Sequence, residues 1–126
     1  MSVIALRALN ESVNFDHKLL NGLFQKLPER EAEKILLQTL ENISITLSAI
    51  QESYFSEERE GLVHALCALR NFSNRVGFTK LARLAADAQL VYETGNNTAL
   101  AAVIHRLLRV GDQSLQRIWD VDFNHY

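Results

Sequence analysis

The chain has 126 residues, the size of one domain, and is too short to divide comfortably into two. Hydrophobic residues make up 48% and charged residues 22%, which is typical of globular proteins and argues against intrinsic disorder. The formal net charge is -2, so no global basic field would attract nucleic acid or an anionic membrane.

The start of the chain lacks the basic residues and apolar run of a signal peptide, and nowhere do about eighteen apolar residues follow one another. We therefore expect a cytoplasmic protein with no membrane segment. One cysteine excludes an internal disulfide, and four scattered histidines form no zinc-ligand pattern. We expect no metal ion and no other cofactor.

One proline and five glycines are too few for a sheet-rich fold, while apolar residues recur at helical spacing, so the sequence predicts an all-α fold. A first helix is predicted from about Asn14 to Leu27, where Pro28 interrupts it. A second is predicted from Pro28 to Ser53. Its apolar residues alternate at spacings of four and three, which is typical of helices packed nearly antiparallel. They are Leu36, Leu40, Ile43, Leu47 and Ile50.

Ser56 is predicted to cap a third helix, because Glu57 and Glu58 follow it in the first turn, where the helix dipole favours negative charge. This helix is expected to continue to Val76. Gly77 then marks a break.

A fourth helix is predicted from Thr79 to about Val91, and a last one from about Thr98 to Trp119, with Asn97 as its cap. Gly111 within the last helix indicates close packing against a neighbouring helix. Short connections between long amphipathic helices favour an up-and-down antiparallel four-helix bundle. With the short additional N-terminal helix, it would form a single domain over residues 1–126.

The third helix is predicted to point its cysteine at solvent. At about 100° per residue, the apolar side chains fall on one arc and Cys67 falls opposite its centre. The arc comprises Leu62, Ala65, Leu66, Leu69, Phe72 and Val76. A free cysteine is usually buried, so an outward one marks a candidate site. The predicted neighbours of Cys67 on the outer face are Glu60, Val63, His64, Arg70, Asn71 and Asn74.

The stretch from Cys67 to Leu81 resembles the signature of the histidine phosphotransfer (HPt) family. That signature has a histidine, an apolar residue at plus two, a basic residue at plus three, glycine at plus ten and leucine at plus fourteen. Anchored on Cys67, this chain matches it at Leu69, Arg70, Ser73, Val76, Gly77 and Leu81. The following helix and the segment from Leu19 to Pro28 are also similar to the family, so the resemblance covers most of the chain.

Three positions depart from the family pattern. Cys67 replaces the phosphoacceptor histidine, Asn71 replaces a glycine that keeps the surface open, and Phe72 replaces a small residue. The resemblance implies a bundle that binds a response-regulator receiver domain or a histidine kinase. It implies a partner surface at Val63, His64, Cys67, Arg70, Asn71, Asn74 and Lys80.

Since the acceptor is missing, we expect a two-component signalling protein that binds its partner without itself carrying phosphate. The sequence contains no Gly-rich phosphate loop and no residue order suggestive of a catalytic triad, so we do not expect an enzyme.

Three alternatives stay open. The first is an active phosphorelay carrier using His64, although anchoring the motif there places Asn74 where the second glycine belongs. The second is a structural bundle outside signalling, in which Val63 and the segment from Trp119 to Phe123 pack against a second copy to form a homodimer. The third is a redox role for Cys67 beside Arg70.

Overall fold

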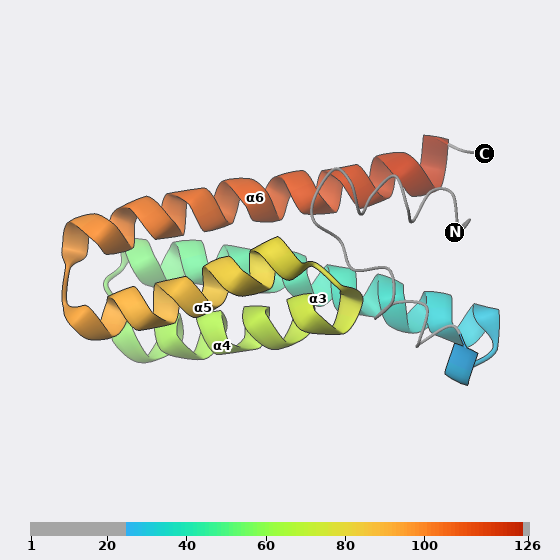
Figure 1. Cartoon of the computed structure of the whole chain (residues 1–126), viewed down its shortest axis with the longest axis horizontal. Coiled ribbons are helices and arrows are strands. Elements are labelled where there is room, and N and C mark those ends of the chain that lie inside the picture. Colours follow the sequence, from blue (N-terminus) through green and yellow to red (C-terminus); the bar gives the residue numbers. More distant parts are fainter. Residues whose placement is uncertain (1–24, 125–126) are drawn as a thin grey trace.

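Four amphipathic stretches of the sequence form four helices in the structure, a computed structural model that describes the backbone of residues 25–124 and the side chains of residues 25–118 (Figure 1). The helices are α3 (Glu29–Phe55), α4 (Arg59–Val76), α5 (Thr79–Thr94) and α6 (Asn97–Asn124). No strand occurs among the described residues. The helix expected from Asn14 to Leu27 lies mostly outside the described residues, which begin at residue 25. The all-helical prediction is confirmed for the described part of the chain.

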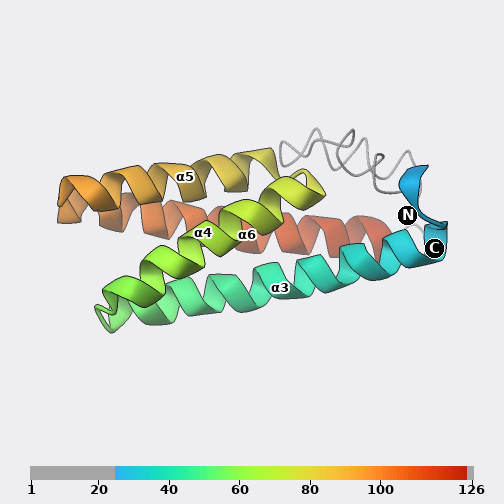
Figure 2. The same ribbon diagram turned by 90° about the horizontal axis from the view of Figure 1, so that it is seen from below.

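The helices are arranged as a four-helix bundle. Each helix packs against the next one along the chain, and α6 packs back against α3. Figures 1 and 2 show all four lying side by side, with the short connections at residues 56–58, 77–78 and 95–96. This closed set of contacts encloses one hydrophobic core. No helix among the described residues is both long and apolar enough to cross a membrane.

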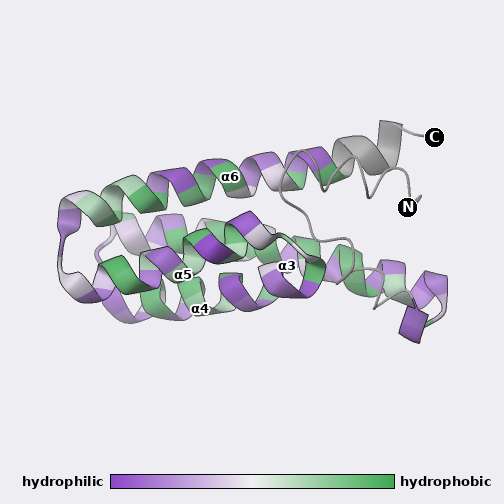
Figure 3. Cartoon of the chain, in the orientation of Figure 1, coloured by the Kyte–Doolittle hydropathy of each residue, from purple (hydrophilic) through white to green (hydrophobic). Residues whose placement is uncertain are grey.

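The core follows from the helical spacing of apolar residues, which turns one stripe of each helix inward. Figure 3 shows apolar and polar residues alternating around each helix. On α4 the predicted stripe is confirmed: all of its members are buried except Phe72, which is half-buried against the core. The largest fully buried side chains are Phe78, Leu36, Ile43, Ile50, Leu66, Leu69, Leu81, Ile104 and Leu107.

The predicted cap of the third helix is wrong. Ser56 ends α3 instead of starting α4: its hydroxyl donates a hydrogen bond to the Glu52 carbonyl at 2.7 Å, and its backbone N–H donates to the same oxygen at 3.0 Å. The N-cap of α4 is Glu58, whose side chain makes no capping hydrogen bond. The helix α3 runs two residues past the expected end, because Tyr54 packs against the core and continues its apolar stripe.

The start of α6 also differs from the prediction by one residue. The Asn96 side-chain oxygen accepts a hydrogen bond from the Ala99 N–H at 3.0 Å, so Asn96 is the capping residue and Asn97 is already helical. At the other end, α6 continues through Asn124 rather than ending at Trp119. The proposed packing of the segment from Trp119 to Phe123 concerns side chains outside the described ones.

Gly111 allows α6 to lie very close to α3, as its position in the helix predicts. A Cβ atom at this residue would lie 2.7 Å from both methyl carbons of Leu47, which is closer than real Cβ atoms come to their neighbours. Leu47 is itself buried in the core. The absence of a side chain at residue 111 therefore sets the spacing of these two helices.

Candidate functional site

The exposed side of α4 presents Cys67. The thiol is exposed, and so are its neighbours on the same side of the helix. We name this surface the α4 outer face; it consists of Val63, His64, Cys67, Arg70, Asn71 and Asn74. Val63 is 43% exposed and gives this face an apolar contact point among polar side chains.

Packing on the opposite side of α4 fixes the direction of Cys67. Leu66 and Leu69 are fully buried, so the helix cannot rotate about its axis without exposing them. The C-terminal end is fixed by Gly77, whose left-handed conformation (φ 81°) lets the Phe78 N–H donate to the Ser73 carbonyl at 2.8 Å. Phe78, the next residue along the chain, is buried in the core. These contacts hold Cys67 outward.

Phe72, the bulky residue at a small-residue position of the HPt pattern, does not cover the outer face. It is half-buried against the core. The Arg75 guanidinium carbon lies 5.9 Å from the centre of its ring. Five residues of helix correspond to a rotation of about 140°, so Arg75 and Arg70 point to different sides of α4. Arg70 is thus the arginine that shares the outer face with Cys67.

Lys80 differs from the other six residues of the expected partner surface. It is half-buried in the first turn of α5, the helix that packs beside α4. The structure thus brings six of the expected residues together on one helix and places Lys80 on its neighbour.

The chemistry available on the α4 outer face comes from a thiol, an imidazole, a guanidinium, two amides and one apolar side chain. Such a set suits hydrogen bonds and a single charged contact with the surface of a partner. Among the described side chains, those of residues 25–118, no three of histidine, cysteine, aspartate or glutamate are grouped so that they could hold a metal ion.

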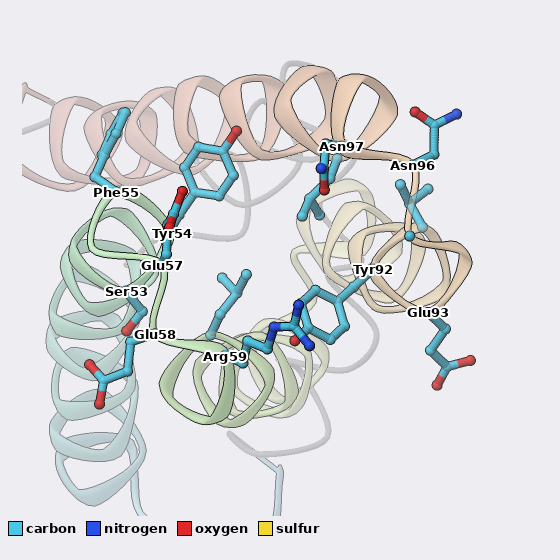
Figure 4. Close-up of a pocket in the computed structure, with 14 residues that line it drawn as sticks. Ser53, Tyr54, Phe55, Glu57, Glu58, Arg59, Tyr92, Glu93, Asn96 and Asn97 are labelled. Carbon is cyan, nitrogen blue, oxygen red and sulfur yellow. The ribbon is translucent and has the colours of Figure 1, made fainter.

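A second feature, which the sequence analysis missed, is a pocket of about 960 Å³ at one end of the bundle (Figure 4). It lies between the α3–α4 connection and the α5–α6 connection. The signal that would have indicated it is the arrangement of the helices, because the α3–α4 and α5–α6 connections lie at the same end of the bundle in Figure 1. Its lining comprises Ser53, Tyr54, Phe55, Glu57, Glu58, Arg59, Leu62, Val91, Tyr92, Glu93, Gly95, Asn96, Asn97 and Leu100.

Comparisons of the chain with models of protein families, with curated protein sequences and with solved structures each found no significant match. The similarity to HPt domains therefore stays a prediction from the stretch between Cys67 and Leu81.

Proposed function

We propose that the chain is an HPt-like two-component signalling protein that binds a receiver domain or a histidine kinase through the α4 outer face and does not itself carry phosphate. In this proposal the bundle is up-and-down and antiparallel, is preceded by a short N-terminal helix, and works in the cytoplasm without enzymatic activity. The single observation that supports it is the exposure of Cys67 on α4, at the position of the phosphoacceptor in the HPt pattern.

In phosphotransfer the receiver and the carrier supply different groups. A chain can therefore keep the surface that binds the receiver and still lack the phosphoacceptor. The receiver supplies the magnesium ion and most of the charge stabilisation of the transition state, while the carrier supplies an exposed nucleophile and a nearby cation. Arg70, exposed one turn after Cys67, matches that cation. The imidazole that would form the phosphoramidate is what this chain lacks at residue 67.

His64 is the second candidate for a phosphate carrier, since it is exposed on the same face. It precedes Cys67 by one turn, a displacement of about 5 Å along the helix axis. A misplacement of about 1 Å can already cost a hundredfold in an in-line reaction. We therefore favour a protein that binds its partner without carrying phosphate.

A phosphotransfer assay tests the acceptor position. Receiver domains charged with acetyl phosphate are mixed with the natural chain, with Cys67→His and with Cys67→His/His64→Gln. We expect no acid-labile phosphate on the natural chain and labelling of both variants, because the docking geometry persists and only the nucleophile is missing. Phosphate on His64 of the natural chain would contradict the proposal and establish the carrier alternative.

A binding experiment tests the surface itself. Val63→Glu places a charge within the α4 outer face, while Leu90→Glu places the same charge on α5 at a residue that is 64% exposed. We expect Val63→Glu to weaken binding of the receiver or kinase by roughly tenfold, and Leu90→Glu to leave it unchanged. If no receiver and no kinase associates with the natural chain at micromolar concentrations, the proposal fails.

A further inference from the structure

The outer side of α3, opposite the core, carries exposed apolar residues. Figure 2 shows this helix along the lower edge of the bundle. Among the described side chains, five large apolar ones are exposed, and three of them belong to α3: Leu37 (42%), Ile45 (60%) and Phe55 (62%). Leu37 and Phe55 are about five helical turns apart, and Ile45 falls within about 80° of them around the helix. We name this sector the α3 outer face; it consists of these three residues and the exposed charged residues Arg30, Lys34, Glu41 and Glu52.

A hollow of about 490 Å³ lies on the same side of α3. It is lined by Ser48, Gln51, Glu52, Phe55 and Ser56. Gln51, Glu52 and Phe55 follow Ser48 by three, four and seven residues, so these four are neighbours on the helix surface. Four residues arranged in this way form the hole that receives one side chain of a facing helix in knobs-into-holes packing. The hollow therefore fits an apolar side chain of another helix.

The charge of the α3 outer face changes sign along the helix. Arg30 and Lys34 lie in its first part, whereas Glu41 and Glu52 lie further on. At about 100° per residue, the other acidic residues near the start of α3 fall outside this sector. They are Glu29, Glu31 and Glu33. A second helix of the same sequence, running in the opposite direction, would therefore bring its acidic part to the basic part of the first.

We propose that the α3 outer face binds the same face of a second copy of this chain, with the two α3 helices antiparallel across a twofold axis near Ser44 and Ile45. Ile45 lies beside the axis and packs against Ile45 of the second copy. Leu37, about two turns earlier, comes level with the hollow between Ser48 and Phe55 of the second copy and fills it. The axis forms this contact twice, because a twofold interface uses the same patch on both subunits.

The charges favour this antiparallel arrangement over a parallel one. With the axis near Ile45, Lys34 lies near Glu52 of the second copy, and Arg30 lies near Glu58 of the second copy. A parallel pair would instead bring each charged residue to its own equivalent, and like charges in contact weaken an interface. The α3 outer face is therefore complementary to itself in shape and in charge when the two helices run in opposite directions.

This interface has no residue in common with the α4 outer face. It also differs from the homodimer expected through Val63, which lies on α4. The inference does not depend on the proposed signalling function: a dimer can fail to bind a receiver, and a monomer can bind one. One helix from each copy makes a small interface, so we expect a dissociation constant of roughly 10–100 μM.

Sedimentation velocity of the full chain, from about 1 μM to about 1 mM, tests the inference. We expect a monomer–dimer equilibrium for the natural chain. Ile45→Glu places two carboxylates beside the twofold axis, so it should weaken dimerisation at least roughly tenfold. Leu90→Glu adds the same charge to α5, at a residue that is 64% exposed, and should leave the equilibrium unchanged. A monomer at every concentration, or a dimer weakened by Val63→Glu and not by Ile45→Glu, would overturn the inference.

Cross-linking tests the direction of the two helices. In a Cys67→Ser background, Ile45→Cys and Phe55→Cys each introduce a single cysteine on the α3 outer face, and copper phenanthroline serves as the oxidant. We expect a disulfide-linked dimer from Ile45→Cys, because this position lies beside the axis. Phe55→Cys is the control, since its two copies would lie about 30 Å apart along the paired helices and cannot be bridged. A circular dichroism spectrum checks the fold of each variant. Equal linking at both positions would indicate parallel helices and overturn the assignment.

Discussion

At the scale of single residues, Glu57 occupies a conformation that favours glycine. Its φ of 56° costs a residue with a Cβ atom about 1–2 kcal/mol. Among the described residues, the other two left-handed helix ends, at residues 77 and 95, are both glycines. At residue 57 the chain thus has a side chain where the backbone conformation is unfavourable for one.

We expect Glu57→Gly to raise the free energy of unfolding by about 1 kcal/mol, because the strain of the left-handed backbone is removed. Glu57→Ala is the control: it removes the carboxylate but keeps the Cβ atom, so it should give no such gain. Urea unfolding followed by circular dichroism measures both. Equal stabilisation by alanine and glycine would show that the charge, rather than the backbone, is the cause.

Two adjacent asparagines differ in their contribution to α6. Asn96 accepts the hydrogen bond from the Ala99 N–H, and Asn97 is the first helical residue. We expect Asn96→Ala to lower the free energy of unfolding by about 1 kcal/mol and Asn97→Ala to change it little. Thermal unfolding of both variants compares the two positions. A larger loss at residue 97 would contradict this assignment of the cap.

At the scale of helices, the pair α3 and α6 depends on the absence of a side chain at residue 111. Alanine would favour the helix by about 1 kcal/mol, but its Cβ atom would meet Leu47 in a packed core, where overpacking costs about 1–3 kcal/mol. We expect Gly111→Ala to be destabilising by about 1 kcal/mol, as measured by urea unfolding.

Shortening the facing side chain tests whether this contact is the cause. Leu47→Ala alone creates a cavity and lowers the free energy of unfolding. In that background, Gly111→Ala should become neutral or stabilising, because its Cβ atom enters the vacated space. Additive effects of the two substitutions would rule out the close contact as the explanation.

The helices could be predicted from the sequence better than their ends. Apolar spacing identifies the buried stripe of α4 and the outward direction of Cys67, because burial repeats with the period of the helix. Caps are less predictable, since serine and asparagine bind backbone groups at either end of a helix. Ser56 therefore ends α3 although it precedes two glutamates, and the adjacent Asn96 and Asn97 are indistinguishable by residue type.

At the scale of the whole molecule, one core joins the four helices. Phe78, in the connection between α4 and α5, is 0% exposed and belongs to the same cluster as residues from every described helix. We expect Phe78→Ala to lower the free energy of unfolding by about 3–5 kcal/mol. Phe55→Ala, at a residue that is 62% exposed, should lower it by less than about 1 kcal/mol. Comparable losses would contradict a core centred on Phe78.

The pocket could not be predicted from the local sequence, because it is assembled from two connections that are distant along the chain. Tyr54 and Tyr92 each lie at the apolar spacing of their helix. This spacing is equally compatible with burial in a closed core. Only the arrangement of all four helices brings them to one opening. The α4 outer face, by contrast, lies within a single helix and could be predicted from periodicity alone.

The exposed thiol has a practical consequence. The sequence contains one cysteine, and the structure places it on the outside of a helix held by buried leucines. A maleimide fluorophore or a nitroxide spin label would therefore attach at a single known position without any engineered substitution. Its signal would report directly when another molecule covers this part of the surface.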